Sequence, residues 1–272
     1  MPVVFRCVKP LKVLILAALS TPAVCYGYGA KAHRLAGHIA ESRLCDTAAQ
    51  KFAEILPDMS LAEAGLWADQ IRSDRDWDFA RPWHYINVPD DTPIAAAERS
   101  PDGDVLGAIE DLTAQLSDGR VAGLERETAL LMLVHFVVDI HQPLHVGRKS
   151  DLGGNRIQVR LDPFRGNLHA YWDTQVFAAL DSTAAQAAEL LSAADPRLFA
   201  QAGEGSPLVW ATESQDLRAR VYDFDRDARG RAILSPEYQA MARAISQERL
   251  VQAGLRLADL LNGMWCRPFR GS

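Results

Sequence analysis

The stretch His-Phe-Val-Val-Asp-Ile-His-Gln-Pro-Leu-His occupies residues 135–145 and closes a long apolar segment of the chain. That segment, Leu124 to Ile140, is apolar on most faces and therefore predicts a buried central helix. Pro143 cannot continue a helix and should end this one. His135 and Asp139 are four residues apart, so both side chains leave the same helical face. Because an aspartate among apolar residues is costly to bury without a cation, the stretch predicts a metal site inside a helical protein.

The same combination of residue types recurs on either side of this stretch. His169 and Asp173 repeat the four-residue spacing, Asp69 precedes His84 earlier in the chain, and His145 ends the quoted stretch. Zinc is commonly bound by imidazole nitrogen together with carboxylate oxygen, and pairs on helices provide preformed ligand arms. We therefore expect these residues to bind metal together with the pair on the central helix.

Two other histidines have interpretations that do not involve direct metal ligation. A lone histidine on an apolar helix is usually a hydrogen-bonded core residue, and we favour that role for His38. His141 is expected to support the metal ligands by hydrogen bonding instead of binding metal itself.

Helical periodicity dominates the chain outside the central segment. The expected first helix buries Leu35, Ile39 and Ala40. Asp46 is expected to cap a second helix that runs through Leu56, and a capping box of Ser60 and Glu63 is expected to open a third that runs through Trp67 to Ile71. Further helices are expected around 105–116, from Tyr171, around Val209 to Tyr222, and from Pro236 to Met264. Turns at 153–155 and 163–166 with alternation at Ile157 and Val159 predict one small β-hairpin. The predicted fold class is all-α, a single mostly helical domain with that one hairpin.

The first 27 residues have the pattern of a secretory signal peptide. Arg6, Lys9 and Lys12 make a basic start, and the apolar run from Leu11 to Ala18 is shorter than the roughly 17–25 residues that a membrane span needs. A membrane anchor is the alternative that this length disfavours. The predicted organisation is a signal at 1–27 and one mature domain at 28–272, secreted or periplasmic, with no membrane span.

Net charge limits the ways in which the protein can bind nucleic acid, and the cysteines indicate its redox compartment. The formal net charge is −6, which disfavours binding to duplex nucleic acid through counterion release. Bound metal ions can still attract a phosphate locally. Cys7 and Cys25 would leave with the signal, and the remaining Cys45 and Cys266 are expected to form a disulfide in an oxidising compartment.

Six motifs together resemble those of a known enzyme family. They are Tyr-Gly-Ala-Lys-Ala-His at 28–33, Trp-Ala-Asp-Gln-Ile-Arg at 67–72, Trp-His-Tyr-Ile-Asn at 83–87, the stretch at 135–145, Gly-Gly-Asn at 153–155 and Asn-Leu-His-Ala-Tyr-Trp-Asp at 167–173. In order and spacing, over nearly the whole mature chain, they resemble the mung-bean-type single-strand-specific nucleases and 3′-nucleotidases. That family is a sister group of the bacterial zinc phospholipases C, and the resemblance implies their helical fold type.

The resemblance implies three zinc ions and a residue-by-residue ligand set. The first ion would be held by Asp69, His84, His135 and Asp139, and the second by His145, His169 and Asp173. Asp139 would also reach the third ion, which His33 and the amine and carbonyl of the mature N-terminal residue would complete. The family typically has tryptophan at that position, whereas this chain has Tyr28. Because the ligating atoms are backbone atoms, the metal site should tolerate the change.

The resemblance also implies roles in catalysis and substrate binding. Arg72 would act with Asp69 in catalysis by contacting the phosphate as charge builds, although a surface salt bridge is its ordinary alternative. Tyr85 would stack on a base, with Asn87 and Asn155 also binding substrate, although core packing is the alternative for the tyrosine. Two neighbouring zinc ions can activate a water for attack on phosphorus. The implied function is a monomeric, secreted phosphodiesterase that hydrolyses single-stranded DNA and RNA to 5′-phosphate products and removes 3′-phosphate from nucleotides.

Two rival functions are weighed against this one. A zinc phospholipase C acting on phosphatidylcholine shares the metal set, but that branch has glutamate at the position of Asp173 and a longer separation between the N-terminus and the first histidine. A non-catalytic zinc-binding or scavenging protein would not need Arg72 or Tyr85. The sequence therefore favours the nuclease over both.

Overall fold

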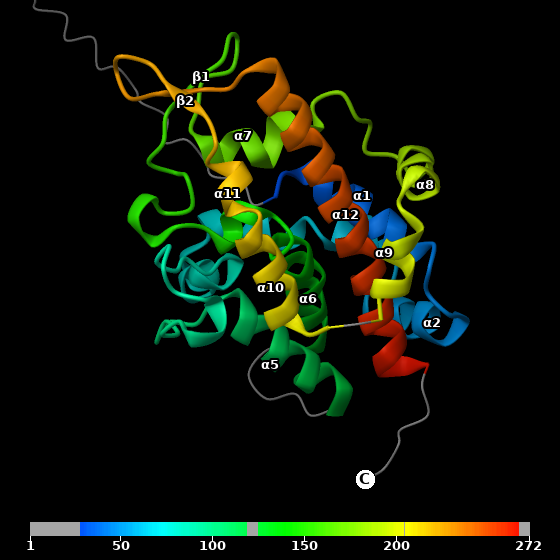
Figure 1. Ribbon diagram of the computed structural model, residues 1–272. Coiled ribbons are helices and arrows are strands. Elements are labelled where there is room, and N and C mark those ends of the chain that lie inside the picture. The colour runs from blue at the N-terminus through cyan, green and yellow to red at the C-terminus, as the bar shows by residue number, and fades with distance from the viewer. Residues whose placement is uncertain (1–27, 119–124, 204, 267–272) are drawn as a thin grey trace, which may run out of the picture.

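Helix α6 (Arg126–Asp139) lies at the centre of the protein, and its residues from Ala129 to Asp139 are all buried. The computed structural model describes residues 28–118, 125–203 and 205–266, and Figure 1 shows α6 surrounded by other helices. The predicted buried central helix is therefore confirmed, although Leu124 lies outside the described residues. The helix ends before Pro143, which opens the short 3-10 helix η4 (Pro143–Val146) instead of terminating α6 directly.

The described residues are mostly helical, so the predicted fold class is confirmed. The other α-helices are α1 (Ala30–Glu41), α2 (Asp46–Ile55), α3 (Leu61–Ala64), α4 (Trp67–Gln70), α5 (Val105–Asp118), α7 (Leu168–Thr174), α8 (Ala184–Ala193), α9 (Pro196–Gln201), α10 (Pro207–Asp216), α11 (Arg218–Val221) and α12 (Pro236–Trp265). Further 3-10 helices are η1 (Ile71–Ser73), η2 (Arg75–His84), η3 (Ile94–Ala96), η5 (Lys149–Asp151) and η6 (Gln175–Phe177). α1, α3, α4, α5 and α12 all pack against α6.

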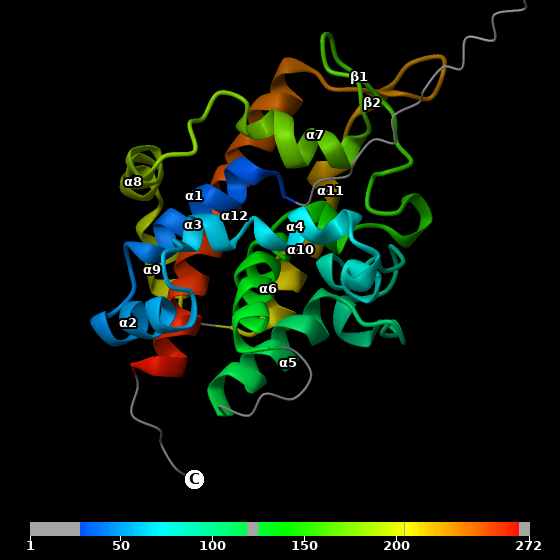
Figure 2. The same ribbon diagram turned by 180° about the vertical axis from the view of Figure 1, so that it is seen from behind.

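Close helix packing brings the N-terminal histidine His33 toward α6. α1 lies beside α12 in both views (Figures 1 and 2), and glycine at position 254 allows this approach. A Cβ at Gly254 would come within 2.6 Å of the Ile39 side chain. α1 also packs on α3, where a Cβ at Gly37 would lie 2.5 Å from the Ala62 backbone. The apolar face predicted for this first helix is buried, as expected.

The third predicted helix is interrupted, which corrects the expectation of one continuous helix to Ile71. Ser60 and Glu63 form the predicted capping box of α3, but α3 ends at Ala64 and α4 begins only at Trp67. At the break, the Gly65 carbonyl lies 2.7 Å from the ring Nδ1 of His135. Apolar periodicity cannot reveal such a tertiary bond to the backbone, so the sequence alone predicts an unbroken helix.

Two other predicted helix boundaries are also wrong. The helix expected around Val209–Tyr222 is divided into α10 and α11, and the turn at Leu217 directs the buried Arg218 toward the Val146 carbonyl at 2.7 Å. The helix expected from Tyr171 begins earlier, at Leu168, because the Asn167 side chain caps it. The helices predicted around 105–116 and from 236 to 264 are confirmed as α5 and α12.

The structure adds to the predicted local hairpin a three-stranded sheet, which joins β1 to two strands much later in the chain. β1 (Val159–Arg160) pairs in parallel with β3 (Ala232–Ile233), which pairs antiparallel with β2 (Asp225–Arg226). The segment expected to fold back on β1 does so as a minimal hairpin, with an antiparallel bridge between Gln158 and Asn167. The Val159 N–H donates to the Gly166 carbonyl at 3.0 Å, and the Leu168 N–H donates to the Ile157 carbonyl at 2.8 Å. The partner strands are two residues long, so periodicity gave no signal for them.

Cys45 and Cys266 form the predicted disulfide, with their Cα atoms 6.7 Å apart. Cys45 also caps α2, because its sulfur accepts a hydrogen bond from the Ala48 N–H at 3.3 Å. Asp46, the predicted cap, is instead the first residue of that helix. Cys266 lies at the C-terminal end of α12, so the bond joins the start of the second helix to the end of the last.

The N-terminal predictions fall outside the described ranges. The signal at 1–27, including Cys7 and Cys25, is not among the described residues. Within the residues that are described, no helix combines the length and the apolar character that crossing a bilayer requires.

Candidate metal centre

Histidines and aspartates from six different helical elements converge in the interior. They form three groups in which the potential ligand atoms lie within 4.8 Å of one another. The groups are His33, His135 and Asp139; Asp69, His84 and His135; and His145, His169 and Asp173. All eight side chains predicted to bind metal belong to these groups, and all but Asp69 are buried. Each group offers the nitrogen and oxygen donors that zinc prefers.

Asp139 lies at the junction of these groups. Its Oδ2 is 2.9 Å from His84 Nδ1 and 3.0 Å from His135 Nε2. Its Oδ1 is 3.4 Å from His33 Nε2 and 3.5 Å from His145 Nδ1. The two oxygens of one fully buried carboxylate thus face ring nitrogens of four histidines, an arrangement that suits a bridging ligand.

Backbone carbonyls orient three of the histidine rings. The Nδ1 atom of His135 donates to the Gly65 carbonyl at 2.7 Å, that of His145 to the His84 carbonyl at 2.8 Å, and that of His169 to the Gly153 carbonyl at 2.7 Å. A carbonyl only accepts hydrogen bonds, so the proton sits on Nδ1 and Nε2 is presented to the centre. Such supporting bonds fix the ring orientation of metal-binding histidines.

Several polar atoms in these groups are buried and make no hydrogen bond within the described part of the chain. They are both ring nitrogens of His33, Nε2 of His145 and Oδ2 of Asp173. A buried polar atom without a partner is costly, and native proteins rarely leave several in one place. Metal ions would satisfy these atoms with the donor types that are present, so the residues fit a metal centre.

Burial and the nearby carboxylates shift the pKa values of these histidines in different directions. Burial opposes protonation of His135, but the Asp139 and Asp69 carboxylates outweigh it and raise the pKa of His135 to about 9. Burial, together with the nearby His135 and despite Asp139, lowers the pKa of His84 to about 4. Burial alone would raise the pKa of Asp139, yet the surrounding histidines hold it well below its usual value. Without a metal, a proton on His135 supplies the positive charge that these carboxylates require.

The backbone nitrogen of Tyr28 lies at the edge of the first group, 3.3 Å from Asp139 Oδ1. Its ring is fully buried, packs edge-on against Phe177 at 5.2 Å between centroids, and donates its hydroxyl to the Ser246 carbonyl at 3.0 Å. Tyrosine therefore fills the position at which the resembling family has tryptophan, and the hydroxyl finds its own partner.

Sequence reasoning missed one supporting residue and misassigned two. The fully buried Gln142 donates from Nε2 to Asp173 Oδ1 at 2.8 Å, and only its place inside the 135–145 stretch hinted at this. His141, expected to support the ligands, instead bonds the Val137 carbonyl and lies 3.0 Å from an Arg256 nitrogen, because the turn after α6 rotates it away. His38 is not a core residue: it is partly exposed, 3.9 Å from Glu41.

A surface pocket of about 200 Å³ opens onto two of the three groups, the one that contains His84 and the one that contains His145 and His169. It is lined by Arg72, His84, Tyr85, Asn87, Leu144, His145, Leu152, Asn155 and His169. Every residue predicted to bind substrate or phosphate therefore lines a single cavity with three of the candidate ligands. Tyr85 is 40% exposed, which argues against core packing as its role.

The polar side chains of this pocket have distinct environments. Arg72 is partly exposed and donates from Nη1 to Asp69 Oδ1 at 3.2 Å, so its guanidinium is tied to a candidate metal ligand. Asn87 Oδ1 is buried and makes no hydrogen bond within the described residues. Asn155 is held within its own loop, where Nδ2 donates to the Leu152 carbonyl at 2.9 Å and Oδ1 accepts from Asn167 at 3.3 Å.

A mostly helical protein with buried histidine and aspartate groups under an open pocket has the arrangement expected of a metal-dependent enzyme. The sequence profile of the S1/P1 nucleases matches residues 28–265. The chain is 30% identical to Endonuclease 2 of Arabidopsis thaliana, covering 87% of this chain and 90% of that protein, and 31% identical to Endonuclease 4, covering 92% and 93%. It is 26% identical to Nuclease S1 of Aspergillus oryzae, covering 93% and 96%. The chain therefore belongs to the S1/P1 nuclease family.

Proposed function

We propose that this chain is a secreted, zinc-dependent phosphodiesterase that hydrolyses single-stranded DNA and RNA to 5′-phosphate products and removes 3′-phosphate from nucleotides. The observation that carries the proposal is the opening of one pocket, with Arg72 and Tyr85 on its wall, onto the buried histidine and aspartate groups. Membership of a nuclease family and the nuclease names of the relatives support it. The signal at 1–27 would direct export, and the enzyme would act as a monomer.

The proposed metal set is three zinc ions. Asp69, His84 and His135 would hold the first together with one oxygen of Asp139, and His145, His169 and Asp173 would hold the second. The other oxygen of Asp139 would join His33 and the Tyr28 backbone around the third. The distances around Asp139 and the unpartnered nitrogens of His33 support this division. When bound, the ions would supply Lewis-acid polarisation of the phosphate and a water activated near neutral pH.

The chain's own side chains would orient the substrate over that centre. Arg72, tied to Asp69, would place its guanidinium against the phosphate oxygens and stabilise the charge that develops on them. Tyr85 would stack on a base, and Asn87 and Asn155 would line the same subsite. Base pairing hides the face of a base, so a stacking tyrosine favours single strands without strong sequence preference.

One assay panel tests this function. The zinc-loaded mature protein is incubated with single-stranded DNA, RNA, a 3′-nucleotide and phosphatidylcholine, each with and without a chelator. We expect hydrolysis of the first three substrates, 5′-phosphate on the polynucleotide products, and no activity with chelator. Cleavage of phosphatidylcholine alone would establish the phospholipase instead. Bound zinc with no hydrolysis of any substrate would establish a binding protein.

Zinc binding to the metal-free protein is expected to release protons at pH 7. The pKa of His135 is raised to about 9, so its ring carries an additional proton at pH 7 that zinc must displace. Despite burial, the Asp139 and Asp173 carboxylates raise the pKa of His145 in the same direction. As pH falls below 9, protons compete more strongly and zinc affinity declines. A pH indicator in weakly buffered solution measures the release. His38→Ala, outside the groups, should release the same number, and zinc uptake without proton release would contradict the expectation.

Replacing Tyr85 by alanine is expected to lower kcat/KM for a single-stranded oligonucleotide. The fall should correspond to about 1–3 kcal/mol of lost transition-state stabilisation, the value of one stacked base. The kcat/KM for a matched abasic oligonucleotide should change little, because that substrate has no base to stack on the tyrosine. Tyr85→Phe keeps the ring and serves as the control, with near-normal cleavage of both substrates. Equal losses on both substrates would assign Tyr85 a packing role.

A further inference from the structure

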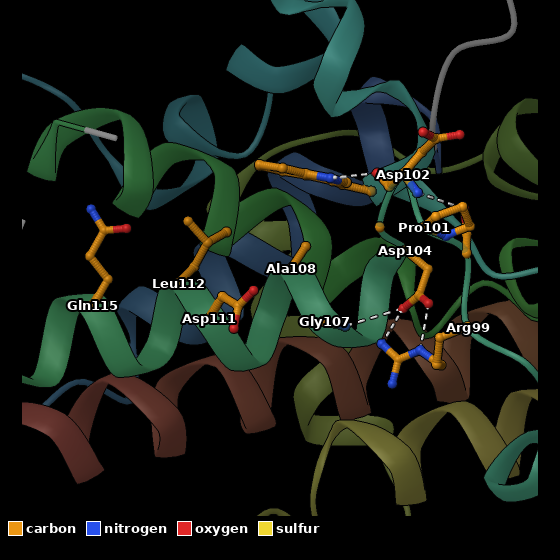
Figure 3. Close-up of a pocket in the computed structure, with 12 residues that line it drawn as sticks. Arg99, Pro101, Asp102, Asp104, Gly107, Ala108, Asp111, Leu112 and Gln115 are labelled. Carbon is orange, nitrogen blue, oxygen red and sulfur yellow. Dashed lines mark hydrogen bonds and ion pairs between the residues drawn. The ribbon is translucent and has the colours of Figure 1, made fainter. Parts of the chain in front are cut away.

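A second, larger pocket lies outside the metal centre, beside η2 and α5. Its volume is about 510 Å³, and its lining runs from Trp83 through the loop 99–104 to one face of α5. Figure 3 shows Ala108, Asp111 and Leu112 rising from α5, with the loop that carries Pro101 and Asp102 above the N-terminal half of that helix. None of the candidate metal ligands lines this pocket.

The wall of this pocket is built by a set of mutually supporting contacts. The Trp83 indole Nε1 donates to the Asp102 carbonyl at 3.2 Å. Gly103 has φ +87°, and a Cβ there would come within 2.6 Å of the indole nitrogen, so the loop approaches the ring more closely than another residue would allow. Asp104 is buried, binds the Arg99 guanidinium with both oxygens, and accepts from the Leu106 N–H at the start of α5. The pocket is therefore preformed.

The charge of the lining excludes a phosphate as the occupant. Asp102, Asp104 and Asp111 are the carboxylates of the wall, and Arg99 is its cation. The guanidinium is already engaged by both oxygens of Asp104, which leaves the exposed carboxylate of Asp111 to face the pocket (Figure 3). A carboxylate accepts hydrogen bonds and repels anions, so the wall disfavours an anionic group and suits one with N–H donors.

The pocket is also joined to the substrate-binding residues of the metal centre. Trp83 directly precedes the candidate ligand His84 and stands two residues before Tyr85. The Tyr85 carbonyl accepts a hydrogen bond from the Val105 N–H at 3.3 Å, and Val105 directly follows Asp104 of the pocket wall. The backbone of residues 83–85 and the start of α5 therefore link the walls of the two pockets.

We propose that this pocket binds a guanine base of the substrate strand, with the Trp83 indole as its aromatic wall and the Asp111 carboxylate as its acceptor. An indole wall suits a planar base. Guanine carries N1–H and N2–H side by side, and a carboxylate can accept both at once in the bidentate way that it accepts from guanidinium. The ligand class rests on the proposed nuclease function. The site would give the enzyme a preference for guanine near the scissile bond.

Equilibrium dialysis of guanosine against the zinc-loaded mature protein tests the inference without requiring catalysis. Two guanosines per chain are expected, one at Tyr85 and one at Asp111. Asp111→Ala should weaken one of them by about tenfold or more, because a hydrogen bond to a charged group is lost, and Tyr85→Ala should weaken the other. Inosine lacks the 2-amino group, so it should bind more weakly only at the Asp111 site. Glu110→Ala, exposed and outside the lining, is the matched control and should bind as wild type.

The possible outcomes separate this inference from the proposed function. A single guanosine per chain, or two whose affinities Asp111→Ala leaves unchanged, would overturn the guanine site even if the nuclease assays succeed. Two guanosines with the expected sensitivity to Asp111→Ala would support the site even in a protein that cleaves no polynucleotide. Glu110 lies outside the lining of both pockets, so cleavage of a 3′-nucleotide by Glu110→Ala should remain at the wild-type rate.

Discussion

Replacing Asp139 by asparagine is expected to remove bound metal and to lower kcat/KM by about a hundred- to ten-thousandfold. Asp139 is fully buried, and its two oxygens face four candidate histidine ligands within 3.5 Å. Asparagine preserves the shape but removes the charge, so the cations lose the counter-ion that they share. Leaving a buried charge without its partner costs about 3–5 kcal/mol, and we expect this cost to appear as lost metal binding. Where the lost binding is expressed in full in kcat/KM, each 1.36 kcal/mol is tenfold in rate.

Three measurements on the same preparation check this expectation. Elemental analysis gives the zinc content, a thermal melt with and without chelator gives the contribution of metal to stability, and kinetics give the rate. Chelation should lower the melting temperature of the wild type and change that of Asp139→Asn far less, because little metal remains to be removed. Asp216→Asn, at an exposed position on α10, is the matched control. A variant that keeps three zinc ions and the wild-type rate would show that Asp139 is not a bridging ligand.

The parts of the centre that lie within one helix were predictable from spacing alone. His135 and Asp139 on α6, like His169 and Asp173 on α7, are separated by one helical turn, and local geometry fixes their common direction. The convergence of these pairs with His33, by contrast, depends on the packing of α1 against α12. In the sequence, only the family resemblance indicates that convergence.

The contacts that orient the ligands could not be predicted in the same way. Three histidines donate to the carbonyls of Gly65, His84 and Gly153, and any residue type offers a carbonyl, so the sequence carries no mark of these bonds. The dependence on tertiary contacts also explains why His141 was wrongly expected to support the metal ligands. Its direction depends on the turn after α6 and on Arg256, which comes from α12, more than a hundred residues later.

The strands of the small sheet could not be predicted for a related reason. Its central strand, β3, has two residues and pairs with β1 across about seventy residues of intervening chain. Alternation is detectable only over longer runs, and a long-range pairing leaves no trace in local composition. Pocket shape has the same dependence on tertiary structure, because Trp83, loop 99–104 and α5 meet only when η2 packs against α5.

An added Met-Gly before Tyr28 is expected to remove about one zinc ion per chain and most of the activity. The Tyr28 nitrogen and His33 Nε2 lie 3.3 Å and 3.4 Å from the same oxygen of Asp139, and the ring nitrogens of His33 make no hydrogen bond within the described residues. If export cleaves the chain between Gly27 and Tyr28, that nitrogen becomes a free amine with a pKa near 7.7–8.0, which yields its proton readily to zinc. A peptide nitrogen offers no comparable lone pair.

The experiment compares one protein before and after release of its N-terminus. A cleavable extension that leaves Tyr28 as the first residue allows zinc content and turnover to be measured on the same preparation. The extended form should hold two zinc ions and melt as a folded protein, because Tyr28 keeps its ring contact with Phe177 and its hydroxyl bond to Ser246. Cleavage should restore the third ion and the rate together. Three zinc ions and full turnover in the extended form would exclude the amine as a ligand and leave His33 and Asp139 to hold that ion without it.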